Sequence, residues 1–392
     1  MKIARRFLTL LVPAIAVLPL FFVAVAQKAP KKMQYLAYIG TYTAKTNSKG
    51  IYVYRFDASS GQLSAGEVAA ESPDPSFLAL HPSGKYLYAV NEVGNFGGQN
   101  SGAVSAFAID RKTGSLKLLN QQATRGAGPC HVSLDKTVKF VLVANYDGGS
   151  IASFPVHDDG SLGEAVGFVQ HSGSSADKQR QEAAHAHWIA TSPDNRFVLV
   201  ADLGLDEVLI YRFDAAKGSL SPNDPPFAKV DPGAGPRHLA FHPNGKFAYV
   251  LNEITATVTA FSYQPAKGSL SVLQTVDTLP NTYKGPKEAA EIAVHPSGKF
   301  LYTSNRAGID AITSFAIDRT KGTLKQAGQF TTKGKTPRNF AIDPTGTFLL
   351  AANQESNNIV VFRIDPATGS LTPTGQSVEV PAPVCITFLP LE

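Results

Sequence analysis

Histidine, arginine and glutamate residues interrupt a repetitive sequence where the other copies of the repeat carry different residue types. Scaffold positions of a repeat protein stay alike from copy to copy, so a copy with unusual chemistry marks a candidate site. Glutamate or histidine can take a proton from water, and guanidinium groups can bind an anion or stabilise charge on a carbonyl oxygen. The candidate catalytic residues found in this way are His187, Arg237, Glu253 and Arg306.

Three aligned positions of the repeat supply these residues. The first position, at the start of the innermost strand of each unit, reads Ser76, Cys130, His187, Arg237, Ala290, Arg338 and Val384. The second position, one residue later, reads Phe77, His131, Trp188, His238, Glu291, Asn339 and Cys385. The third position, directly after the second strand, reads Glu92, Tyr146, Leu203, Glu253, Arg306 and Gln354. Because successive side chains of a strand alternate, we expect the first two positions to face opposite sides of each strand.

The first and third positions are expected to meet at one mouth of a channel. The first two strands of each unit should run antiparallel, so the start of one lies beside the end of the other. We therefore predict that the catalytic candidates converge there, and we assign substrate binding to four further side chains: Arg338, Glu92, His131 and His185. Buried charges are costly unless they are used or mutually paired. The structural alternative is an inert ring of ion pairs, in which Glu253 and Arg306 tie two units together.

Metal binding is the less favoured interpretation of the histidines. His185 and His187 are spaced as His-x-His, but the sequence supplies no third ligand nearby. The two cysteines, Cys130 and Cys385, lack the spacing of a zinc site. We expect no metal, no cofactor, and two unpaired cysteines that are buried as small apolar residues.

The elements that position these residues come from a seven-fold repeat. A turn signature of Asp or an equivalent, followed by Gly-Ser-Leu or a variant, occurs seven times with its leucines 46 to 58 residues apart. A second signature, Pro-x-Gly-Lys followed by an alternating apolar run that ends in Asn or Asp, marks the preceding hairpin. In the first unit these patterns predict strands at residues 77–80, 86–90, 103–109 and 116–122. The fold class that follows is all-β: a seven-bladed β-propeller with four antiparallel strands per blade.

The seventh blade must be assembled from both ends of the chain. Residues 35–69 supply its outer strands and residues 383–389 its inner strand, which closes the ring and leaves only short edges. We predict one propeller domain over residues 35–392, preceded by a flexible lead-in at residues 27–34. The polar segment 170–184 lies between two units and is expected to form a loop over one mouth of the ring.

Residues 1–26 have the pattern of a signal peptide. The basic residues Lys2, Arg5 and Arg6 precede an apolar run that ends in Ala-Val-Ala. An uncleaved membrane anchor is the alternative, but Pro13 and Pro19 interrupt the run. We expect cleavage, and a periplasmic or secreted protein that is not attached to the membrane.

Composition argues against nucleic-acid binding. Of the formal net charge of +5, three positive charges lie in the first 26 residues, and the other basic residues are spread thinly through turns. The 43% of hydrophobic and 17% of charged residues are ordinary for a protein with a large core. We expect a monomer, with a dimer as the alternative, that acts on a small molecule.

The chain resembles the seven-bladed lactonase family, which includes propeller-type bacterial 6-phosphogluconolactonases and fungal carboxy-muconate cyclases. The likeness extends over nearly the whole chain and rests on five motifs: Tyr38-Ile39-Gly40-Thr41-Tyr42, Gly235-Pro236-Arg237-His238, Leu251-Asn252-Glu253, Ser304-Asn305-Arg306 and Pro383-Val384-Cys385-Ile386. In the cyclase branch the family site consists of a His, an Arg, a Glu and a second Arg. These match His187, Arg237, Glu253 and Arg306 in order and approximate spacing. The resemblance implies lactone chemistry, either hydrolysis or the reverse cyclisation of an unsaturated diacid.

A lactonase-like hydrolase is therefore the expected function. It would open a sugar or related lactone, as 6-phosphogluconolactonases do, by base-assisted attack of water. We expect Glu253 or His187 to be the base and Arg237 to stabilise the oxyanion, while Arg306 with Arg338 binds a carboxylate or phosphate. Export would separate the enzyme from cytoplasmic 6-phosphogluconolactone, so a different sugar lactone, or a loss of catalysis, is an alternative.

The alternative class is a noncatalytic propeller that binds a ligand or serves as a surface scaffold. Such platforms often present aromatic side chains on the rim of the ring. The rim loops here contain mainly Gly, Asn and Ser, which favours the enzyme.

Overall fold

The computed structural model describes residues 33–391 except residue 65. The predicted signal peptide and most of the predicted lead-in lie outside these residues. The first strand, β1 (Gln34–Thr41), already begins within the predicted lead-in. Every regular element of the described residues is a strand, and none of them forms a helix able to span a membrane.

Six antiparallel sheets of four strands follow one another along the chain. Blade 1 contains β5 (Leu78–Leu80), β6 (Tyr86–Asn91), β9 (Ala103–Ile109) and β10 (Leu116–Ala123), with a small hairpin of β7 (Asn95–Phe96) and β8 (Gln99–Asn100) before β9. Blade 2 contains β11 (Pro129–Leu134), β12 (Phe140–Asn145), β13 (Ser150–Pro155) and β14 (Gly167–Gln170). Blade 3 contains β15 (Ala186–Thr191), β16 (Phe197–Asp202), β17 (Glu207–Asp214) and β18 (Ser219–Lys229).

The next three blades repeat this order. Blade 4 contains β19 (Pro236–Phe241), β20 (Phe247–Asn252), β21 (Thr257–Gln264) and β22 (Ser269–Asp277). Blade 5 contains β23 (Ala289–Val294), β24 (Phe300–Asn305), β25 (Ala311–Ile317) and β26 (Leu324–Thr331). Blade 6 contains β27 (Pro337–Ile342), β28 (Phe348–Asn353), β29 (Asn358–Ile364) and β30 (Leu371–Glu379).

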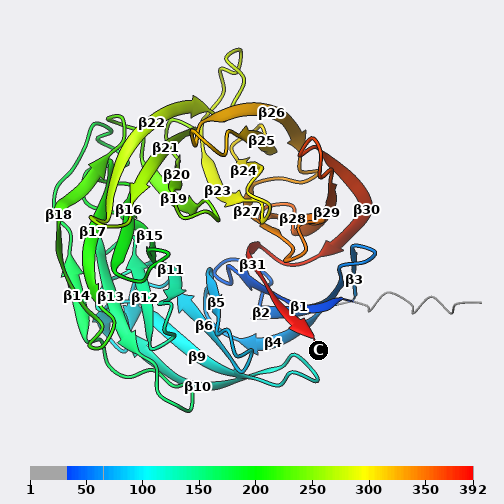
Figure 1. Ribbon diagram of the computed structural model, residues 1–392. Helices are drawn as coiled ribbons and strands as arrows, with labels where there is room; N and C mark the ends of the chain where they lie inside the picture. The colour runs from blue at the N-terminus through cyan, green and yellow to red at the C-terminus, as the bar shows by residue number, and fades with distance from the viewer. Residues whose placement is uncertain (1–32, 65, 392) are drawn as a thin grey trace, which may run out of the picture. The chain divides into compact units, whose positions relative to one another are not determined.

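Blade 7 joins the two ends of the described chain, as the sequence predicts. Its inner strand is β31 (Pro383–Leu391), which pairs antiparallel with β1, with Ile386 opposite Ile39. The strand β2 (Gly50–Asp57) follows, and β3 (Gln62–Leu63) and β4 (Glu67–Glu71) pair with successive parts of it. Figure 1 shows the blue and red strands side by side, and the first strand of each blade nearest the centre of the ring. Contacts of β31 with both β27 and β5 close this ring, which confirms the predicted seven-bladed propeller.

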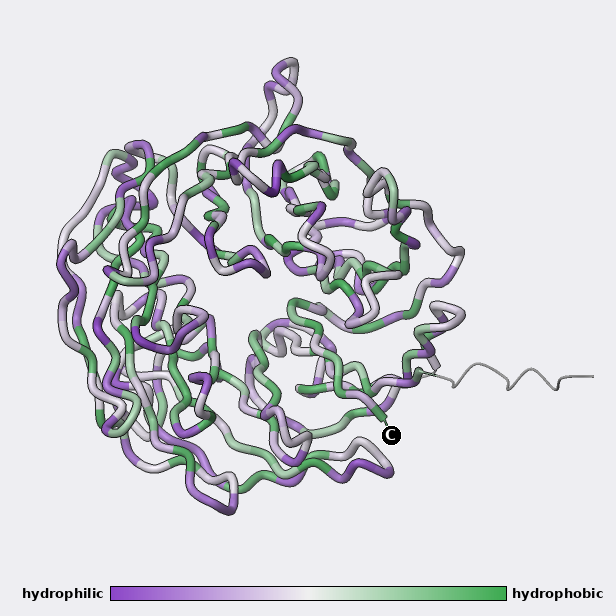
Figure 2. Tube along the Cα trace, in the orientation of Figure 1, coloured by the Kyte–Doolittle hydropathy of each residue, from purple (hydrophilic) through white to green (hydrophobic). Residues whose placement is uncertain are grey.

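The hydrophobic core is divided among the blade interfaces. Each of seven clusters of buried side chains combines residues of two neighbouring blades. Between blades 6 and 7, for example, the rings of Phe56 and Phe348 meet edge to face with centroids 5.8 Å apart. Figure 2 accordingly shows hydrophobic and hydrophilic residues interleaved around the ring. Burial of this kind makes each blade depend on both of its neighbours.

The repeated turn signature has a structural role. In blade 1 the Asp110 carboxylate accepts the backbone N–H of Lys112 at 2.9 Å, and Gly114 adopts a φ of +87°, which favours glycine. The Gly114 carbonyl then accepts the hydroxyl of Tyr38 in blade 7 at 3.0 Å. The signature thus ends a hairpin and ties it to the preceding blade.

Candidate active site

The predicted convergence at one mouth of the ring is present in the structure. A cavity of about 380 Å³, which we call the mouth cavity, is lined by Glu92, Cys130, Tyr146, Asp147, Arg180, His187, Glu253, Glu288, Arg306 and Arg338. A smaller inner cavity shares Glu92, Cys130, His187 and Arg338 with it. This inner cavity is lined by Tyr42, Ser76, Phe77, Glu92, Cys130, His187, Arg237, His238, Glu291, Arg338 and Val384. The four catalytic candidates therefore line these two neighbouring cavities, together with Glu92 and Arg338.

The expectation that the first two repeat positions face opposite sides of the strand is wrong for Arg237 and His238, which line the same inner cavity. In β19, Pro236 pairs with Asn252 and His238 pairs with Leu251, so Arg237 is an extra residue in a β-bulge. The bulge re-aims the side chains, and Arg237 Nη1 lies 3.2 Å from His238 Nε2 in the same inner cavity. Side chains alternate strictly between the two faces of a strand only where its hydrogen-bond ladder is regular. The register also shifts near the start of β11, β15 and β27.

Glu253 is the charged centre of the site. Its Oε2 accepts Arg237 Nε at 2.8 Å and Arg306 Nη2 at 3.0 Å, while its Oε1 accepts Arg180 Nη2 at 2.5 Å. The side chains of Arg237, Arg306 and Glu253 are 3%, 8% and 6% exposed. Both carboxylate oxygens are thus occupied, and the predicted Glu253–Arg306 pair between two blades is part of a larger cluster.

The electrostatic consequence is a carboxylate that stays ionised. Burial alone would raise the pKa of Glu253, but the guanidinium groups of Arg306, Arg237 and Arg180 lower this pKa to about 2. Burial lowers the pKa of Arg306 to about 10, against the attraction of Glu253. Because both of its oxygens already accept guanidinium donors, this carboxylate holds the arginines in place and leaves no free oxygen to accept a proton from water.

Arg180 is a residue of the site that was not identified from the sequence. It lies on the strap, as we call residues 171–185 between β14 and β15, where a loop over the mouth was expected. Buried Asp206 accepts Ser175 Oγ at 2.6 Å and Gln181 Nε2 at 2.7 Å, and so anchors the strap on both sides of Arg180. The Arg180 side chain is 39% exposed, which places it at the rim of the cavity. The polar composition of this inserted segment was the one feature of the sequence that indicated a role at the mouth.

Arg338 differs from the other three arginines of the site. Its guanidinium carbon lies 5.2 Å from the ring centroid of Tyr42, and among the described residues this group has no hydrogen-bond acceptor and no ion pair within 4 Å. The Tyr42 hydroxyl donates to Glu92 at 2.9 Å, which fixes the ring beneath the guanidinium. Arg338 is therefore a cation available to an anionic group in the cavity.

His187 is a neutral base that faces the same space. Burial, followed by the charges of Arg237 and neighbouring groups, lowers its pKa well below the usual histidine range. Its Nδ1 lies 3.7 Å from Cys130 Sγ, and its Nε2 has no partner among the described residues. An unprotonated imidazole with a free nitrogen can accept a proton from water.

The structure places the other two histidine candidates behind the cavity lining. His131 packs between Phe77 and Trp188, with ring centroids 4.3 and 5.6 Å away, and burial lowers its pKa well below the usual range. His185 stacks on Tyr146 at 4.5 Å and 18° and does not line either cavity. Across residues 33–391 no group of three metal-binding side chains is placed to hold an ion. Both cysteines are buried and unpaired, as predicted.

A buried hydrogen-bond network fixes the position of the Arg237 guanidinium group. The carboxylate of Glu291 accepts His238 Nδ1 at 2.9 Å and Asn339 Nδ2 at 2.5 Å. Because the Nδ1–H of His238 donates to Glu291, its Nε2 is the acceptor for Arg237. Arg237 also donates to the Ala290 carbonyl. Its guanidinium is thus fixed by three neighbours, while Nη2 has no acceptor in the described part of the chain.

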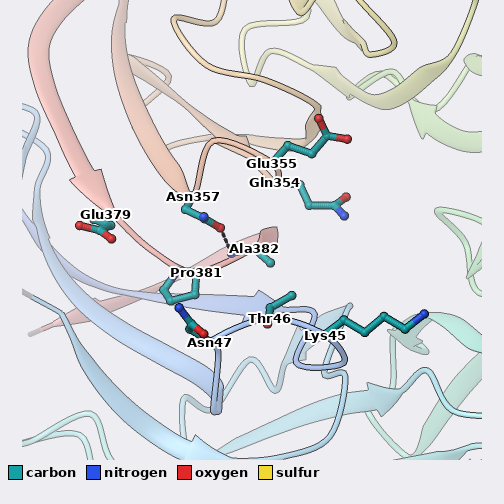
Figure 3. Close-up of a pocket in the computed structure, with 9 residues that line it drawn as sticks. All are labelled: Lys45, Thr46, Asn47, Gln354, Glu355, Asn357, Glu379, Pro381 and Ala382. Carbon is teal, nitrogen blue, oxygen red and sulfur yellow. Dashed lines mark hydrogen bonds between the residues drawn. The ribbon is translucent and has the colours of Figure 1, made fainter.

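A second hollow, of about 430 Å³, carries no comparable chemistry. It lies between the ends of blades 6 and 7 and is lined by Lys45, Thr46, Asn47, Gln354, Glu355, Asn357, Glu379, Pro381 and Ala382. Figure 3 shows its three charged side chains, Lys45, Glu355 and Glu379, well apart from one another. The Asn357 side chain accepts the Ala382 N–H at 2.8 Å, which fixes the loops that form the hollow (Figure 3).

Comparisons with known proteins agree with this fold. The family described as "Lactonase, 7-bladed beta-propeller" matches residues 36–388. A 6-phosphogluconolactonase of Bacillus subtilis is 38% identical over 360 residues, covering 91% of this chain and 99% of the relative. A 6-phosphogluconolactonase of Formosa agariphila is 39% identical over 348 residues, covering 88% and 96%. The structure of a periplasmic gluconolactonase of Pseudomonas aeruginosa aligns with a TM-score of 0.85 and 35% identity, covering 91% of this chain and 99% of that one. The chain therefore belongs to the seven-bladed lactonase family.

Proposed function

We propose that the protein is a lactonase that opens a sugar lactone by adding water to the ring carbonyl. The observation that carries this proposal is the convergence of a neutral His187 with two buried arginines that share Glu253. This set combines a proton acceptor with a fixed positive charge for a developing oxyanion. The names of the relatives support hydrolysis over the reverse cyclisation.

In this mechanism His187 is the base and Glu253 is not. His187 takes a proton from water through its free Nε2 while the water oxygen bonds to the lactone carbonyl carbon. The carbonyl oxygen becomes negatively charged and is stabilised by Arg237 and Arg306. Glu253 keeps these two guanidinium groups in place, so the charge is balanced before the substrate enters.

Substrate binding is assigned to the remaining cations. Arg338 has no acceptor of its own and would bind a carboxylate, a phosphate or another electron-rich oxygen of the substrate. Glu92 fixes Tyr42 beneath Arg338. The proposed partner is therefore a small lactone or an anionic sugar derivative.

We place the mature protein in the periplasm or outside the cell. The signal-peptide pattern of residues 1–26 and the periplasmic gluconolactonase among the structural neighbours support this location. Osmotic-shock fractionation with N-terminal sequencing would detect a chain that starts after the Ala-Val-Ala motif. Recovery of the full-length chain from membranes would contradict the proposal.

A hydrolysis screen tests the function. Wild-type protein, Arg237→Ala and His187→Asn are assayed on glucono-δ-lactone, 6-phosphogluconolactone and simple aliphatic lactones, with the spontaneous reaction subtracted. We expect the wild type to open at least one sugar lactone and both folded variants to lose about 100-fold or more in kcat/KM. Equal rates for wild type, variants and buffer would refute catalysis and support a noncatalytic binding protein.

A further inference from the structure

The cavity holds a second glutamate whose surroundings are the reverse of those of Glu253. Glu253 is bound by three guanidinium groups. Glu92, which follows β6, lines both the mouth and inner cavities but has no cation within ion-pair distance among the described residues. Two carboxyl groups in one cavity with opposite environments commonly divide acid and base roles between them.

Within the described part of the chain, the hydrogen-bond partners of the Glu92 carboxyl group are all hydroxyl groups. Ser76 Oγ donates to its Oε2 at 2.5 Å, and the Tyr42 hydroxyl lies 3.0 Å from Oε1 and 2.9 Å from Oε2. These hydroxyl groups come from blade 7 and from the start of blade 1, so the carboxyl group is oriented from two directions. Such a group keeps a fixed position whether or not it carries a proton, because hydroxyl groups can donate or accept.

Other ionisable groups face Glu92 from three further blades. Arg338 approaches from blade 6, Arg237 from blade 4, and the Cys130 thiol from blade 2. Burial raises the pKa of Glu92, and this effect exceeds the opposing influence of Arg338, Ser76 and Tyr42. Burial therefore favours the protonated form of Glu92, whereas three guanidinium groups favour the ionised form of Glu253.

We propose that Glu92 is the general acid that protonates the ring oxygen when the lactone opens. The proposal rests on the lactonase function and adds a catalytic residue to it. Among the described residues, Glu92 is the carboxyl group that lines both cavities and has no ion pair. It also separates the base, His187, from the acid, so that each proton transfer has its own residue.

Every bond, electron pair and proton in the proposed hydrolysis is accounted for. Water adds to the ring carbonyl carbon and its proton passes to His187, while the carbonyl π electrons move to the oxyanion held by Arg237 and Arg306. The carbonyl then re-forms and the bond between this carbon and the ring oxygen breaks. The ring oxygen takes the bonding pair and the proton of Glu92 to become a hydroxyl group. The proton gained by His187 is finally returned, through solvent, to Glu92.

Substitution of Glu92 by glutamine gives the first test, because glutamine keeps the shape but cannot supply the proton. Glucono-δ-lactone has an alkoxide leaving group that needs protonation, whereas dihydrocoumarin releases a phenol, a far better leaving group. We expect Glu92→Gln to lower kcat on glucono-δ-lactone about 100-fold and on dihydrocoumarin by less than about threefold. Glu355→Gln, which changes an exposed carboxylate outside both cavities, should leave both rates unchanged.

The pH dependence gives a second test that also applies if dihydrocoumarin is not opened. The wild type should lose kcat/KM toward high pH as Glu92 ionises, and Glu92→Gln should lack this alkaline limb. Tyr42→Phe removes a hydrogen bond that favours the carboxylate, so it should move the limb to higher pH. An unchanged limb in Glu92→Gln, or equal losses on both lactones, would overturn the proposal.

A spectroscopic control separates this proposal from the function on which it rests. In wild-type protein, pH-difference infrared spectra should contain a protonated carboxyl band that Glu92→Gln lacks. If no lactone is opened but the band is present, the proposed function fails while the titration of Glu92 stands. If lactones are opened and the band is absent, Glu92 is not the acid.

Discussion

Arg237 Nε and Glu253 Oε2 lie 2.8 Å apart in a pair that is almost inaccessible to solvent. The two residues come from the start of β19 and the end of β20, which are neighbouring strands of blade 4. Removal of one member of a buried pair is strongly unfavourable, because the other charge is left without compensation. The pair therefore links the stability of the fold to the placement of the proposed oxyanion-binding group.

The first prediction concerns Glu253→Gln. The variant keeps the shape of the side chain but leaves Arg237, Arg306 and Arg180 without their shared anion. We expect the free energy of unfolding to fall by about 3 kcal/mol and kcat/KM to fall at least about 100-fold. Urea denaturation and lactone hydrolysis measure the two effects. Glu355→Gln, an exposed carboxylate beyond the cavity, is the matched control, and equal behaviour of the two variants would contradict our role for Glu253.

The second prediction concerns stability at low pH. The pKa of Glu253 is about 2 in the folded protein against an ordinary value of 4.5, so the unfolded chain binds a proton first as the pH falls. The stabilisation is complete above about pH 4.5 and is lost between about pH 4.5 and 2. Urea midpoints in that range should therefore fall less steeply for Glu253→Gln than for wild type. Parallel slopes would show that the carboxylate is not held by the arginines.

The fold was predictable because its determinants are local and repeated. The turn built on Asp110 and Gly114 recurs in each blade, and its spacing sets both the strands and the number of blades. The composite blade was predictable because the six complete units leave one inner strand unpaired. This strand, β31, finds its partner β1 at the other end of the described chain. His187, Arg237, Glu253 and Arg306 stood out because most other copies carry different residue types at these positions.

The third prediction concerns Arg180 at the rim. Because its pair with Glu253 is partly exposed, Arg180→Gln should change the free energy of unfolding by less than about 1 kcal/mol. We expect KM for 6-phosphogluconolactone to rise about tenfold, since one cation of the cavity is lost, and KM for neutral glucono-δ-lactone to change by less than about threefold. Lys178→Gln removes the same charge from the same strap and should change neither KM. In the described part of the chain the Lys178 ammonium group donates only to the Ser175 carbonyl. A similar rise for both lactones would indicate a purely structural role.

The fourth prediction concerns the acid side of the activity profile. The pKa of His187 is well below the usual histidine range, because of burial and of the charge on Arg237. The imidazole is therefore neutral, and active as a base, throughout the neutral range, so kcat/KM should not decline between about pH 7 and 6. Steady-state kinetics with the spontaneous reaction subtracted measures this. A decline centred near pH 6.5 would mean that the base is an ordinary, solvated histidine.

The parts of the site that were not predicted depend on long-range geometry. A bulge turns Arg237 and His238 toward the same cavity, whereas a regular strand would separate them, and no residue type in the sequence announces the bulge. Arg180 reaches Glu253 across 73 positions of the sequence, through a strap whose course is set by Asp206. The assignment of His131 and His185 to substrate binding remains a prediction, and the structure places both behind the lining residues.

The most direct measurement is a crystal structure of the protein soaked with gluconate, the ring-opened product of glucono-δ-lactone. We predict that the carboxylate lies between Arg237 and Arg306 in the cavity, with one oxygen within hydrogen-bond distance of His187 Nε2. Gluconate bound in the hollow between blades 6 and 7, or nowhere near these three side chains, would contradict the assignment of this cavity as the active site.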